Sequence, residues 1–512
     1  MDNYLFQSNE NSSTQDDQSG LSAQQLFKKG VSITYDDFRV LDTFYTDIND
    51  DEIDLTTEIG KGITLKTPII ASPMDTVTNA KMCIVIANNG GIGCVHMNYK
   101  KMDGTPDIDA QINEIIKVKR HKNGFIEDPL TVRADQTIRE VVELSKNNKL
   151  GTIIKTFPVV DMNKKFIGML RHQDYSSRRN LDLYVKDRMK PADIVMTGYY
   201  GMSLLEATQM LWENHLQVLP IVTQDKELKA LVCWKDVDKL DKYPLATLDD
   251  NQRCRVLFAT ETRPDYAYER IKKGFEAGAD GVVIDTSQGY TKYEKEMVEY
   301  IKKCYPDKLI IGGNISTKEA QKALASWGVD AARIGQGSGS ICTTALAIGV
   351  SRASATGVYE CANSDPKMKS YADGGLKNVG DIVKALSLGA NAVMLGNMLA
   401  GTDEAPGEAK YNHETGEYIK EYRGMGSKEA NTMGVRGYGK LPQGVTGFIP
   451  YRGPLDKLMA LYRDGIVQGM KVLNCRNVPE LQRKTKEGNV RFEMNTNNGG
   501  REMGANVRVK DV

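Results

Sequence analysis

The sequence predicts an α/β fold, a (β/α)8 TIM barrel that is interrupted by an inserted tandem repeat. Short runs of Val, Ile, Ala and Leu that end in small or polar residues recur along the chain, as in "GVVIDTSQG" (281–289) and "AVMLGN" (392–397). Runs that are uniformly apolar and too short for helices are typical of parallel strands covered on both faces. A glycine before several of these runs provides the left-handed cap that ends a preceding helix. Residues 126–245 break this rhythm with two similar segments.

The first 27 residues are expected to form a disordered leader and arm. The opening "MDNYLFQSNENSSTQDDQSG" is polar and acidic, and it lacks the basic start and the apolar run of a signal peptide. The first part of the barrel follows over residues 28–125. There "PIIASPMD" (68–75) and "GGIGCVH" (90–96) have the form of barrel strands.

The repeat consists of a first copy over residues 126–185 and a second copy over residues 186–245. Both copies contain a helix, "TIREVVELSKN" or "SLLEATQMLWEN", followed by two strands joined by a polar turn, "FPVVDMNKKFIGML" or "LPIVTQDKELKALV". Each copy ends at a helix start that carries an aspartate, Asp174 or Asp236. The repeat is therefore expected to form a separate unit inserted in the barrel.

The barrel resumes over residues 246–480, and residues 481–512 form a C-terminal tail. About seven strand–helix units can be counted, and closure into a barrel is the natural arrangement for so many. The alternative is a doubly wound sheet, which is disfavoured because no GxGxxG motif opens the first unit. In a barrel, chemistry lies at the carboxyl ends of the strands, where this sequence places Asp285, Asn314 and Asp373.

Charge and composition argue against nucleic acid or a membrane as a partner. Lys and Arg total 67 and Asp and Glu also total 67, so no overall field attracts polyanions. No apolar run in the sequence is long enough to span a membrane. The 8 cysteines are scattered, without a CxxC pair or a nearby zinc pattern, which is typical of reduced thiols. A cytoplasmic protein is therefore expected.

Cys342 is the candidate nucleophile because of its surroundings, "GQGSGSICTT" (335–344). A cysteine inside a strand usually belongs to the core, as expected for Cys94 and Cys361. Cys342 instead follows a strand inside a run of Gly and Ser, where backbone N–H groups can converge on an anion and favour a thiolate. Packing alone gives no reason for such a run, because ordering glycines costs backbone entropy.

Together these motifs resemble those of the IMP dehydrogenase/GMP reductase family. The resemblance rests on "PIIASPMDTVT", "GGIGCVHMN", "IDTSQG", "GVDAARIGQGSGSICTT", "ADGGLKNVGDIVKALSLGANAVMLGNMLAGTDEAPGE" and "YRGMGS". The repeat resembles a pair of CBS domains, whose usual work is to sense adenine or guanine nucleotides, so regulation by ATP or GTP is implied. An insertion without a ligand is the alternative.

The resemblance implies covalent catalysis on a purine nucleoside monophosphate. In IMP dehydrogenase a cysteine thiolate attacks C2 of the purine, hydride leaves to NAD, and the thioimidate is hydrolysed to XMP. The catalytic residues implied are Cys342, Thr344, Arg436 and Tyr438. The substrate-binding residues implied are Ser72, Met74, Asn314, Arg333, Ser340, Asp373, Gly374, Gly375, Met394, Gly396, Asn397, Tyr422, Gly424, Met425, Gly426 and Gln443. Asp373 would hold the ribose hydroxyls, with capping of the next helix as its alternative role.

The resemblance also implies cofactors and an assembly. NAD would lie against Asp285, Thr286, Ser287, Gly335 and Gly337. Backbone carbonyls of Gly337, Gly339 and Cys342 would ligate a potassium ion, which prefers oxygen ligands. A homotetramer is implied, with stacking into octamers through the CBS pairs, and the tail would fold back over the active site.

Departures at the phosphate site and the flap leave the reaction open. Asn397 stands where these enzymes usually place a phosphate-binding serine, although an amide can still donate. Dehydrogenases carry an adjacent Arg-Tyr pair in a mobile flap, with the arginine as the base that activates water. Here the flap segment (428–453) is shorter, and Gly437 separates Arg436 from Tyr438.

Two further positions bear on the alternative, an NADPH-dependent GMP reductase that releases ammonia. That enzyme also has a short flap segment, but it places a lysine where this chain has Met97 and a glutamate where this chain has Gln443. IMP dehydrogenase is therefore favoured, and a nucleotide-binding paralogue without activity is the third possibility. His96, which precedes Met97, is expected to be structural.

Overall fold

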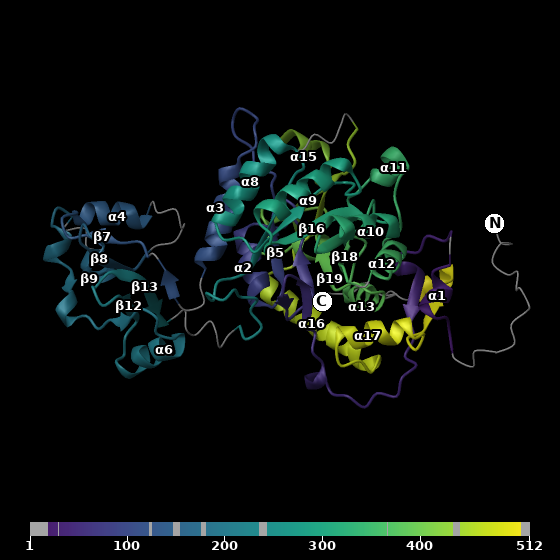
Figure 1. Cartoon of the computed structure of the whole chain (residues 1–512), viewed down its shortest axis with the longest axis horizontal. Helices are drawn as coiled ribbons and strands as arrows, with labels where there is room; N and C mark the ends of the chain where they lie inside the picture. The colour runs from purple at the N-terminus through teal and green to yellow at the C-terminus, as the bar shows by residue number, and fades with distance from the viewer. Residues whose placement is uncertain are drawn as a thin grey trace, which may run out of the picture.

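A large barrel and a smaller insertion make up the computed structural model of the chain (Figure 1). The insertion lies to the left of the barrel in that view, and the barrel carries helices around its wall. The structure describes residues 19–28, 30–121, 125–127, 129–146, 154–175, 181–234, 243–365, 367–433 and 441–502.

Eight parallel strands close the barrel in the order β14-β15-β16-β17-β18-β19-β4-β5. Their bounds are β4 (Ile69–Ala71), β5 (Ile92–Val95), β14 (Val256–Thr260), β15 (Gly281–Ile284), β16 (Leu309–Ile315), β17 (Ala331–Ile334), β18 (Lys369–Asp373) and β19 (Ala392–Leu395). Nearly all of their residues are buried, because helices cover the outer face and side chains fill the interior. The predicted (β/α)8 barrel is confirmed.

The strand that the sequence pattern does not single out is β14. It follows the insertion through residues 243–255, so no helix and no Gly-Ala-Asp turn precede it directly. β14 nevertheless pairs with β5 on one side and β15 on the other. The eighth strand of the barrel is therefore the first strand after the insertion in the sequence.

Helices form the outer layer of the barrel. They include α2 (Ala80–Asn88), α3 (Ile108–Arg120), α8 (Pro264–Glu276), α9 (Lys292–Cys304), α10 (Lys318–Trp327), α12 (Ser354–Ala362), α13 (Val379–Ser387) and α16 (Leu455–Val472). Gly328, which ends α10, has φ +92°, and Gly278 after α8 has φ +93°. Side chains other than glycine rarely adopt this conformation, which explains the glycines before the strands.

The insertion contains two four-stranded sheets, ordered β10-β9-β8-β7 and β11-β12-β13-β6. The strands are β6 (Phe125–Glu127), β7 (Val132–Arg133), β8 (Thr156–Val160), β9 (Phe166–Arg171), β10 (Lys190–Pro191), β11 (Gly198–Tyr199), β12 (Val218–Val222) and β13 (Leu228–Cys233), with helices α4 (Ile138–Lys146) and α6 (Leu204–Glu213). β6 lies at the start of the first copy in sequence, yet it pairs with β13 of the second copy. Phe166 and Met169 of the first copy also share a buried cluster with Leu231 of the second. β10 at the start of the second copy pairs in turn with β9 of the first, so each copy contributes a strand to the sheet of the other and the two share an apolar cluster.

Residues near the N-terminus and the tail meet beside the barrel. β1 (Phe38–Val40) pairs antiparallel with β23 (Phe492–Met494), near α1 (Ala23–Leu26) and α17 (Val478–Lys486). The described tail residues thus pack against α1 and β1, and none of them lines the cavity described below. Residues 503–512 lie outside the described part of the chain, so the expectation that the tail covers the active site is not tested there.

A small sheet follows the last barrel strand. It consists of β20 (Lys410–Asn412), β21 (Glu417–Arg423) and β22 (Thr446–Pro450). The ends of β21 and β22 carry residues 422–426 and 443–445 toward the barrel mouth. Within the described ranges, no helix combines the length and apolarity that a membrane crossing requires.

Candidate active site

A cavity of about 310 Å³ opens at the carboxyl ends of the barrel strands. It is lined by these residues that the sequence singled out: Ser72, Met74, Asp285, Thr286, Ser287, Asn314, Arg333, Gly335, Gly337, Gly339, Ser340, Cys342, Thr344, Asp373, Gly374, Gly375, Met394, Gly396, Asn397, Tyr422, Gly424, Met425, Gly426 and Gln443. Arg436 and Tyr438 lie outside the described residues. Segments far apart in the sequence therefore converge at one barrel mouth, where barrel enzymes place their chemistry.

Several lining residues were not predicted. They are Pro73, Gln288, Gln336, Ser338, Ile341, Ile348, Val350, Leu376, Lys377 and Leu395. All of them except Ile348 and Val350 lie within motifs quoted above, such as Gln336 and Ser338 in the glycine-rich run. The motifs therefore contained the signal for most of these residues.

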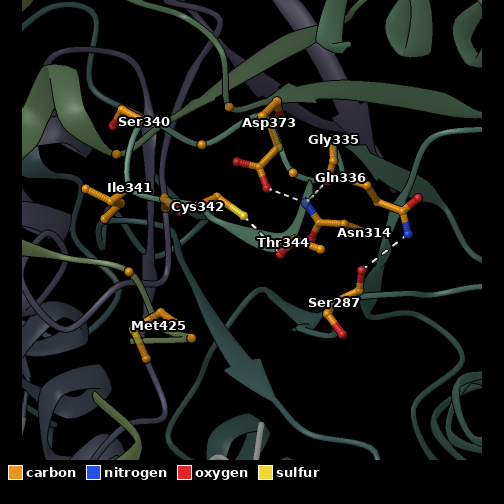
Figure 2. A pocket seen from close by; sticks show the side chains of 18 of the residues that line it. Ser287, Asn314, Gly335, Gln336, Ser340, Ile341, Cys342, Thr344, Asp373 and Met425 are labelled. Carbon is orange, nitrogen blue, oxygen red and sulfur yellow. Dashed lines mark hydrogen bonds between the residues drawn. The ribbon is translucent and has the colours of Figure 1, made fainter. Parts of the chain in front are cut away.

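The thiol of Cys342 lies beside a hydroxyl group. Its Sγ is 3.1 Å from Thr344 Oγ1, and Thr344 Oγ1 donates to Gln443 Oε1 at 3.1 Å. Figure 2 shows Cys342 and Thr344 facing each other in the cavity. Because Thr344 donates its proton to Gln443, its oxygen keeps lone pairs for the thiol proton or for a water.

Backbone hydrogen bonds fix the loop that carries Cys342. Cys342 N donates to Gly339 O at 2.9 Å, which closes a turn within the glycine-rich run. Thr343 N donates to Gln443 O at 3.0 Å, and Val445 N donates to Ile341 O at 3.0 Å. Gln443 and Val445, both within the segment 428–453, therefore hold both sides of the cysteine in place.

The other buried cysteines have a different environment. Cys94 and Cys361 are fully buried, which confirms that they belong to the core. Burial raises the pKa of Cys361 to about 12 and raises the pKa of Cys94 further still. Both remain thiols near neutral pH, whereas Cys342 is only partly buried and lines the cavity.

A network of charged side chains crosses the cavity floor. Arg333 donates from Nη2 to Asp373 Oδ2 at 2.8 Å and from Nη1 to Asp285 Oδ1 at 2.8 Å. Asn314 Nδ2 also donates to Asp373 Oδ2 at 2.8 Å and to Gly335 O at 2.8 Å, as Figure 2 shows. Arg333 therefore pairs with two carboxylates, which offset the cost of burying its charge.

Asp373 does not cap the following helix. The N-cap of α13 is Asn378, whose side chain accepts from Asp381 N. Among the described residues, no hydrogen bond reaches Asp373 Oδ1, while Oδ2 accepts from two side chains. One carboxylate oxygen is therefore available to accept from a ligand hydroxyl.

The amide of Asn397 is oriented by an arginine. Arg452 donates from Nη1 to Asn397 O at 2.9 Å and from Nη2 to Asn397 Oδ1 at 3.2 Å. The Nδ2 group then points to Ser340 Oγ, 3.4 Å away. Because the carbonyl end is engaged, Asn397 presents its donor end to the side of the cavity where a phosphate is expected.

The turn at Gly374 and Gly375 requires glycine. Their φ values are +85° and +80°. A Cβ on Gly375 would lie 2.3 Å from Ser354 Oγ, which leaves no room for a side chain. This turn therefore approaches the cavity with bare backbone.

An ion pair fixes the small sheet to the barrel. Asp75, which follows β4, accepts from Arg423 Nη2 at 2.9 Å and from Arg423 Nε at 3.1 Å. Thr76 Oγ1 accepts from Arg423 N at 3.3 Å. Arg423 ends β21 and stands between Tyr422 and Gly424, so this pair positions two lining residues. The sequence motifs contained Asp75 and Arg423 but gave no signal that they pair.

His96 is buried and does not line the cavity, which agrees with the structural role expected for it. Its ring stacks on Tyr99 at 4.2 Å, and its Nδ1 accepts from Asn98 N at 3.1 Å. Burial lowers the pKa of His96 to about 4, so the ring is neutral at physiological pH. Met97 is also buried, within the barrel interior. Within the described ranges, no cluster of His, Cys, Asp and Glu could hold a metal ion.

Sequence comparisons relate the chain to one family over most of its length. The family model described as "IMP dehydrogenase / GMP reductase domain" matches residues 32–506. Inosine-5'-monophosphate dehydrogenase of Aquifex aeolicus (strain VF5) is 36% identical over 478 residues, which cover 91% of this chain and 94% of that protein. Inosine-5'-monophosphate dehydrogenase of Toxoplasma gondii is 39% identical over 424 residues, which cover 81% of this chain and 74% of that protein.

Solved structures give a complementary result. A GMP reductase variant of Trypanosoma brucei in complex with guanosine 5'-monophosphate is similar with a TM-score of 0.84 and 32% identity, over 94% of this chain and 98% of that one. GMP reductase of the same organism in complex with guanosine 5'-triphosphate is similar with a TM-score of 0.75 and 30% identity, over 91% of this chain and 98% of that one. The chain is thus similar both to proteins named inosine-5'-monophosphate dehydrogenase and to solved structures of GMP reductase.

Proposed function

The chain belongs to the IMP dehydrogenase/GMP reductase family, and we propose that it catalyses the NAD-dependent oxidation of IMP to XMP in guanine nucleotide synthesis. The observation that carries this choice is the partner of Thr344 beside the nucleophile. That partner is the neutral amide of Gln443, at the position where the reductase pattern has a glutamate. Curated relatives named as IMP dehydrogenases support the same reading.

The cavity suits a purine nucleoside monophosphate. Asp373 Oδ1 would accept from the ribose hydroxyls, because Arg333 and Asn314 engage only Oδ2. The donor end of Asn397 and the hydroxyl of Ser340 would bind the 5'-phosphate, together with Gly374, Gly375, Gly396 and Tyr422. Ser72, Met74, Met394, Gly424, Met425 and Gly426 would surround the base and the sugar.

The chemistry begins at Cys342. Its thiolate would add to C2 of IMP, forming a C–S bond, and the hydride on C2 would leave with its electron pair. NAD accepts that hydride when it is bound against Asp285, Thr286, Ser287, Gly335 and Gly337. Water then adds to C2, the C–S bond breaks, and XMP is released with the thiolate restored.

Thr344 would orient the attacking water. Its oxygen lies 3.1 Å from Cys342 Sγ, which is where C2 is bonded in the intermediate. The proton of that water would pass to a base in the flap, for which Arg436 and Tyr438 are the candidates from the family pattern. Both lie outside the described residues.

A potassium ion would be held by the loop of Cys342. The glycine-rich run offers backbone carbonyls at Gly337, Gly339 and Cys342 and contains no carboxylate, a set suited to a monovalent cation. The Gly339 carbonyl accepts from Cys342 N and retains a second lone pair. A bound cation would fix the loop that carries the nucleophile.

The second candidate is an NADPH-dependent GMP reductase. The GMP reductase structures from Trypanosoma brucei favour it, since they cover almost the whole chain. Against it stands Met97, which is 3% exposed and cannot transfer a proton, at the position where the reductase pattern has a lysine. A nucleotide-binding paralogue without turnover is the third candidate.

Two absorbance assays separate these candidates. Purified protein with IMP and NAD should raise the absorbance at 340 nm if it is the dehydrogenase. A fall in absorbance with GMP and NADPH, and none of the first signal, would make it the reductase. If neither assay gives a signal while IMP or GMP still raises the melting temperature, the third candidate holds.

The insertion and the assembly complete the proposal. The two sheets of the insertion would act as a CBS pair that binds ATP or GTP, and one solved relative is a complex with guanosine 5'-triphosphate. The protomers would form a homotetramer in the cytoplasm, with octamers formed through the CBS pairs. Size-exclusion chromatography with light scattering, with and without ATP and GTP, tests both statements.

A further inference from the structure

Glu294 is a fully buried acidic residue that contacts the cofactor side of the cavity. It lies in the first turn of α9 and is 0% exposed. Its Oε1 accepts from Gly313 N at 2.7 Å, and its Oε2 lies 2.9 Å from Thr286 Oγ1. A Cβ on Gly289 or Gly312 would lie 3.0 Å or 2.9 Å from these carboxyl oxygens, so both positions are kept bare where the carboxyl packs.

The two segments that Glu294 contacts are joined to each other. Thr286 N donates to Gly313 O at 3.1 Å, and Asn314 N donates to Thr286 O at 2.9 Å. Gly289 N donates to Asn314 O at 2.8 Å. Asn314 then reaches Asp373 through its side chain, at 2.8 Å. The carboxyl of Glu294 therefore supports both the turn at Thr286 and the strand end that holds Asp373.

The hydrogen bonds around Thr286 favour a protonated carboxyl. The Thr286 hydroxyl has one proton but two oxygen neighbours, Glu294 Oε2 and Gly313 O at 2.8 Å. If Glu294 is ionised, both neighbours are acceptors and one contact lacks a proton. If Glu294 is protonated, it donates to Thr286, Thr286 donates to Gly313 O, and every donor and acceptor is used.

The surroundings of Glu294 explain how it keeps this proton. Burial raises the pKa of Glu294 to about 8, although hydrogen bonds from Thr286 and Gly313 and the charge of Arg333 act in the opposite direction. Arg333 is itself paired with Asp285 and Asp373, and β16 contains no ionisable side chain. The ionisable side chains of α10, which packs against α9, are exposed: Lys318, Glu319 and Lys322.

We propose that Glu294 is a positioning residue that works in its protonated form, and that loss of its proton at alkaline pH releases the turn at Thr286 and weakens dinucleotide binding. An ionised carboxylate in this site would be cut off from solvent. The hydroxyl of Thr286 would then face two acceptors, Glu294 Oε2 and Gly313 O, with a single proton. The inference rests on the proposed function, in which residues 285–287 face the dinucleotide.

The first experiment compares Glu294→Gln with the full-length wild type. A glutamine carbonyl accepts from Gly313 N and its amide donates to Thr286 Oγ1, so the variant copies the protonated carboxyl without a titrating proton. The KM for NAD should agree between the two proteins near pH 7. By pH 9.5 the wild-type KM should exceed that of the variant by about tenfold. Glu296→Gln, an exposed acid on the same helix, is the matched control and should follow the wild type.

Two outcomes would overturn the proposal. Parallel KM profiles for wild type and Glu294→Gln would show that this proton does not control binding. Loss of activity in Glu294→Gln at every pH, with an unchanged melting temperature, would show that the ionised form is the working one.

The second experiment needs no turnover. Because the folded-state pKa of Glu294 is raised above its ordinary 4.5, the folded protein binds an additional proton between about pH 4.5 and 8, and stability falls as pH rises through this window. The melting temperature of Glu294→Gln minus that of the wild type should therefore increase from pH 5 to pH 8 and stay constant above pH 8. A constant difference would refute a protonated Glu294, whereas failure of both absorbance assays would refute only the proposed function.

Discussion

The residues around Cys342 combine a fixed backbone with a polar, accessible side chain. Its amide closes a turn onto Gly339, and Gln443 engages the following residue through its carbonyl. The thiol itself meets Thr344 and the cavity rather than the apolar interior that surrounds Cys94. A nucleophile needs this arrangement, because a thiol in the barrel interior would neither ionise nor reach a substrate.

Replacing the nucleophile should separate chemistry from binding. Cys342→Ala should lower turnover with IMP and NAD by several orders of magnitude, because no covalent intermediate can form. IMP should still raise the melting temperature, since the contacts proposed for its phosphate and ribose do not involve the thiol. Cys304→Ala, which alters an exposed thiol, is the control and should keep full activity. Appreciable turnover in Cys342→Ala would place the covalent chemistry elsewhere.

His96 should make the protein sensitive to acid. Its folded-state pKa is lowered to about 4 by burial, so the unfolded chain binds an additional proton between about pH 4 and 6.5. The associated stability is fully present above pH 6.5 and is lost as pH falls toward 4, by roughly 3 kcal/mol in all.

The His96→Gln variant checks this expectation by chemical denaturation. It should lose less free energy of unfolding than the wild type between pH 7 and pH 4.5. His413→Gln, which changes an exposed histidine, should match the wild type. Equal losses in all three proteins would mean that His96 is already charged in the folded state.

At the level of elements, the small sheet of β20, β21 and β22 positions several lining residues at the barrel mouth. β21 delivers Tyr422 and the turn at 424–426, and the end of β22 lies beside the segment that holds the cysteine loop. The Asp75–Arg423 pair is the main polar link between β21 and the end of β4. Both side chains are almost buried, so removal of either one takes the nearest opposite charge away from the other in a poorly hydrated site.

Asp75→Asn should therefore loosen the substrate side of the cavity. We expect the free energy of unfolding to fall by up to about 3 kcal/mol, since Arg423 loses its buried carboxylate partner and keeps the more exposed Glu421. The KM for IMP should rise more than kcat falls, because Tyr422 and Gly424 line the cavity and are proposed to bind substrate rather than to react. Glu487→Gln, which breaks an exposed pair with Arg483, should change neither quantity measurably. A normal KM for IMP in Asp75→Asn would show that the pair does not position this sheet.

The barrel strands and their polar ends could be predicted because both signals are local. An apolar run followed by Asp or Asn, as at Asp373, is visible in a few residues. Pairings such as Asp75 with Arg423, 348 positions apart, carry no such signal. In the sequence, Glu294 looks like an ordinary acidic residue in the first turn of a helix. Its burial results from tertiary packing against Gly289 and Gly312, which local sequence does not indicate. The exchange of β6 was missed for the same reason, since strand partners are set by tertiary packing.

Across the whole molecule, the insertion leaves and re-enters the barrel at one place. Lys119, at the end of α3, contacts Asp249 at 3.1 Å and Asp280 at 2.6 Å. Asp249 belongs to the segment that returns from the insertion and leads into β14. These side chains are nearly buried at the base of the barrel, so the two junctions are joined independently of the insertion itself.

Excision of the insertion should therefore spare the barrel. Replacing residues 122–245 with a short Gly/Ser linker should give a folded protein that retains turnover with IMP and NAD, because the ends already meet. Any effect of ATP or GTP on the full chain should disappear. A melting curve and the absorbance assay measure both; an insoluble or inactive product would show that the barrel depends on the insertion.

The strand exchange inside the insertion has a consequence for how its sequence can change over generations. The sequences of duplicated units that do not contact each other can diverge independently, because a substitution in one unit leaves the packing of the other unchanged. Here β6 completes the sheet of the opposite copy, and residues of both copies fill one apolar cluster. A substitution in the shared strands or cluster of one copy therefore alters the packing of the other copy. We expect the sequences of the two copies to change in a coordinated way.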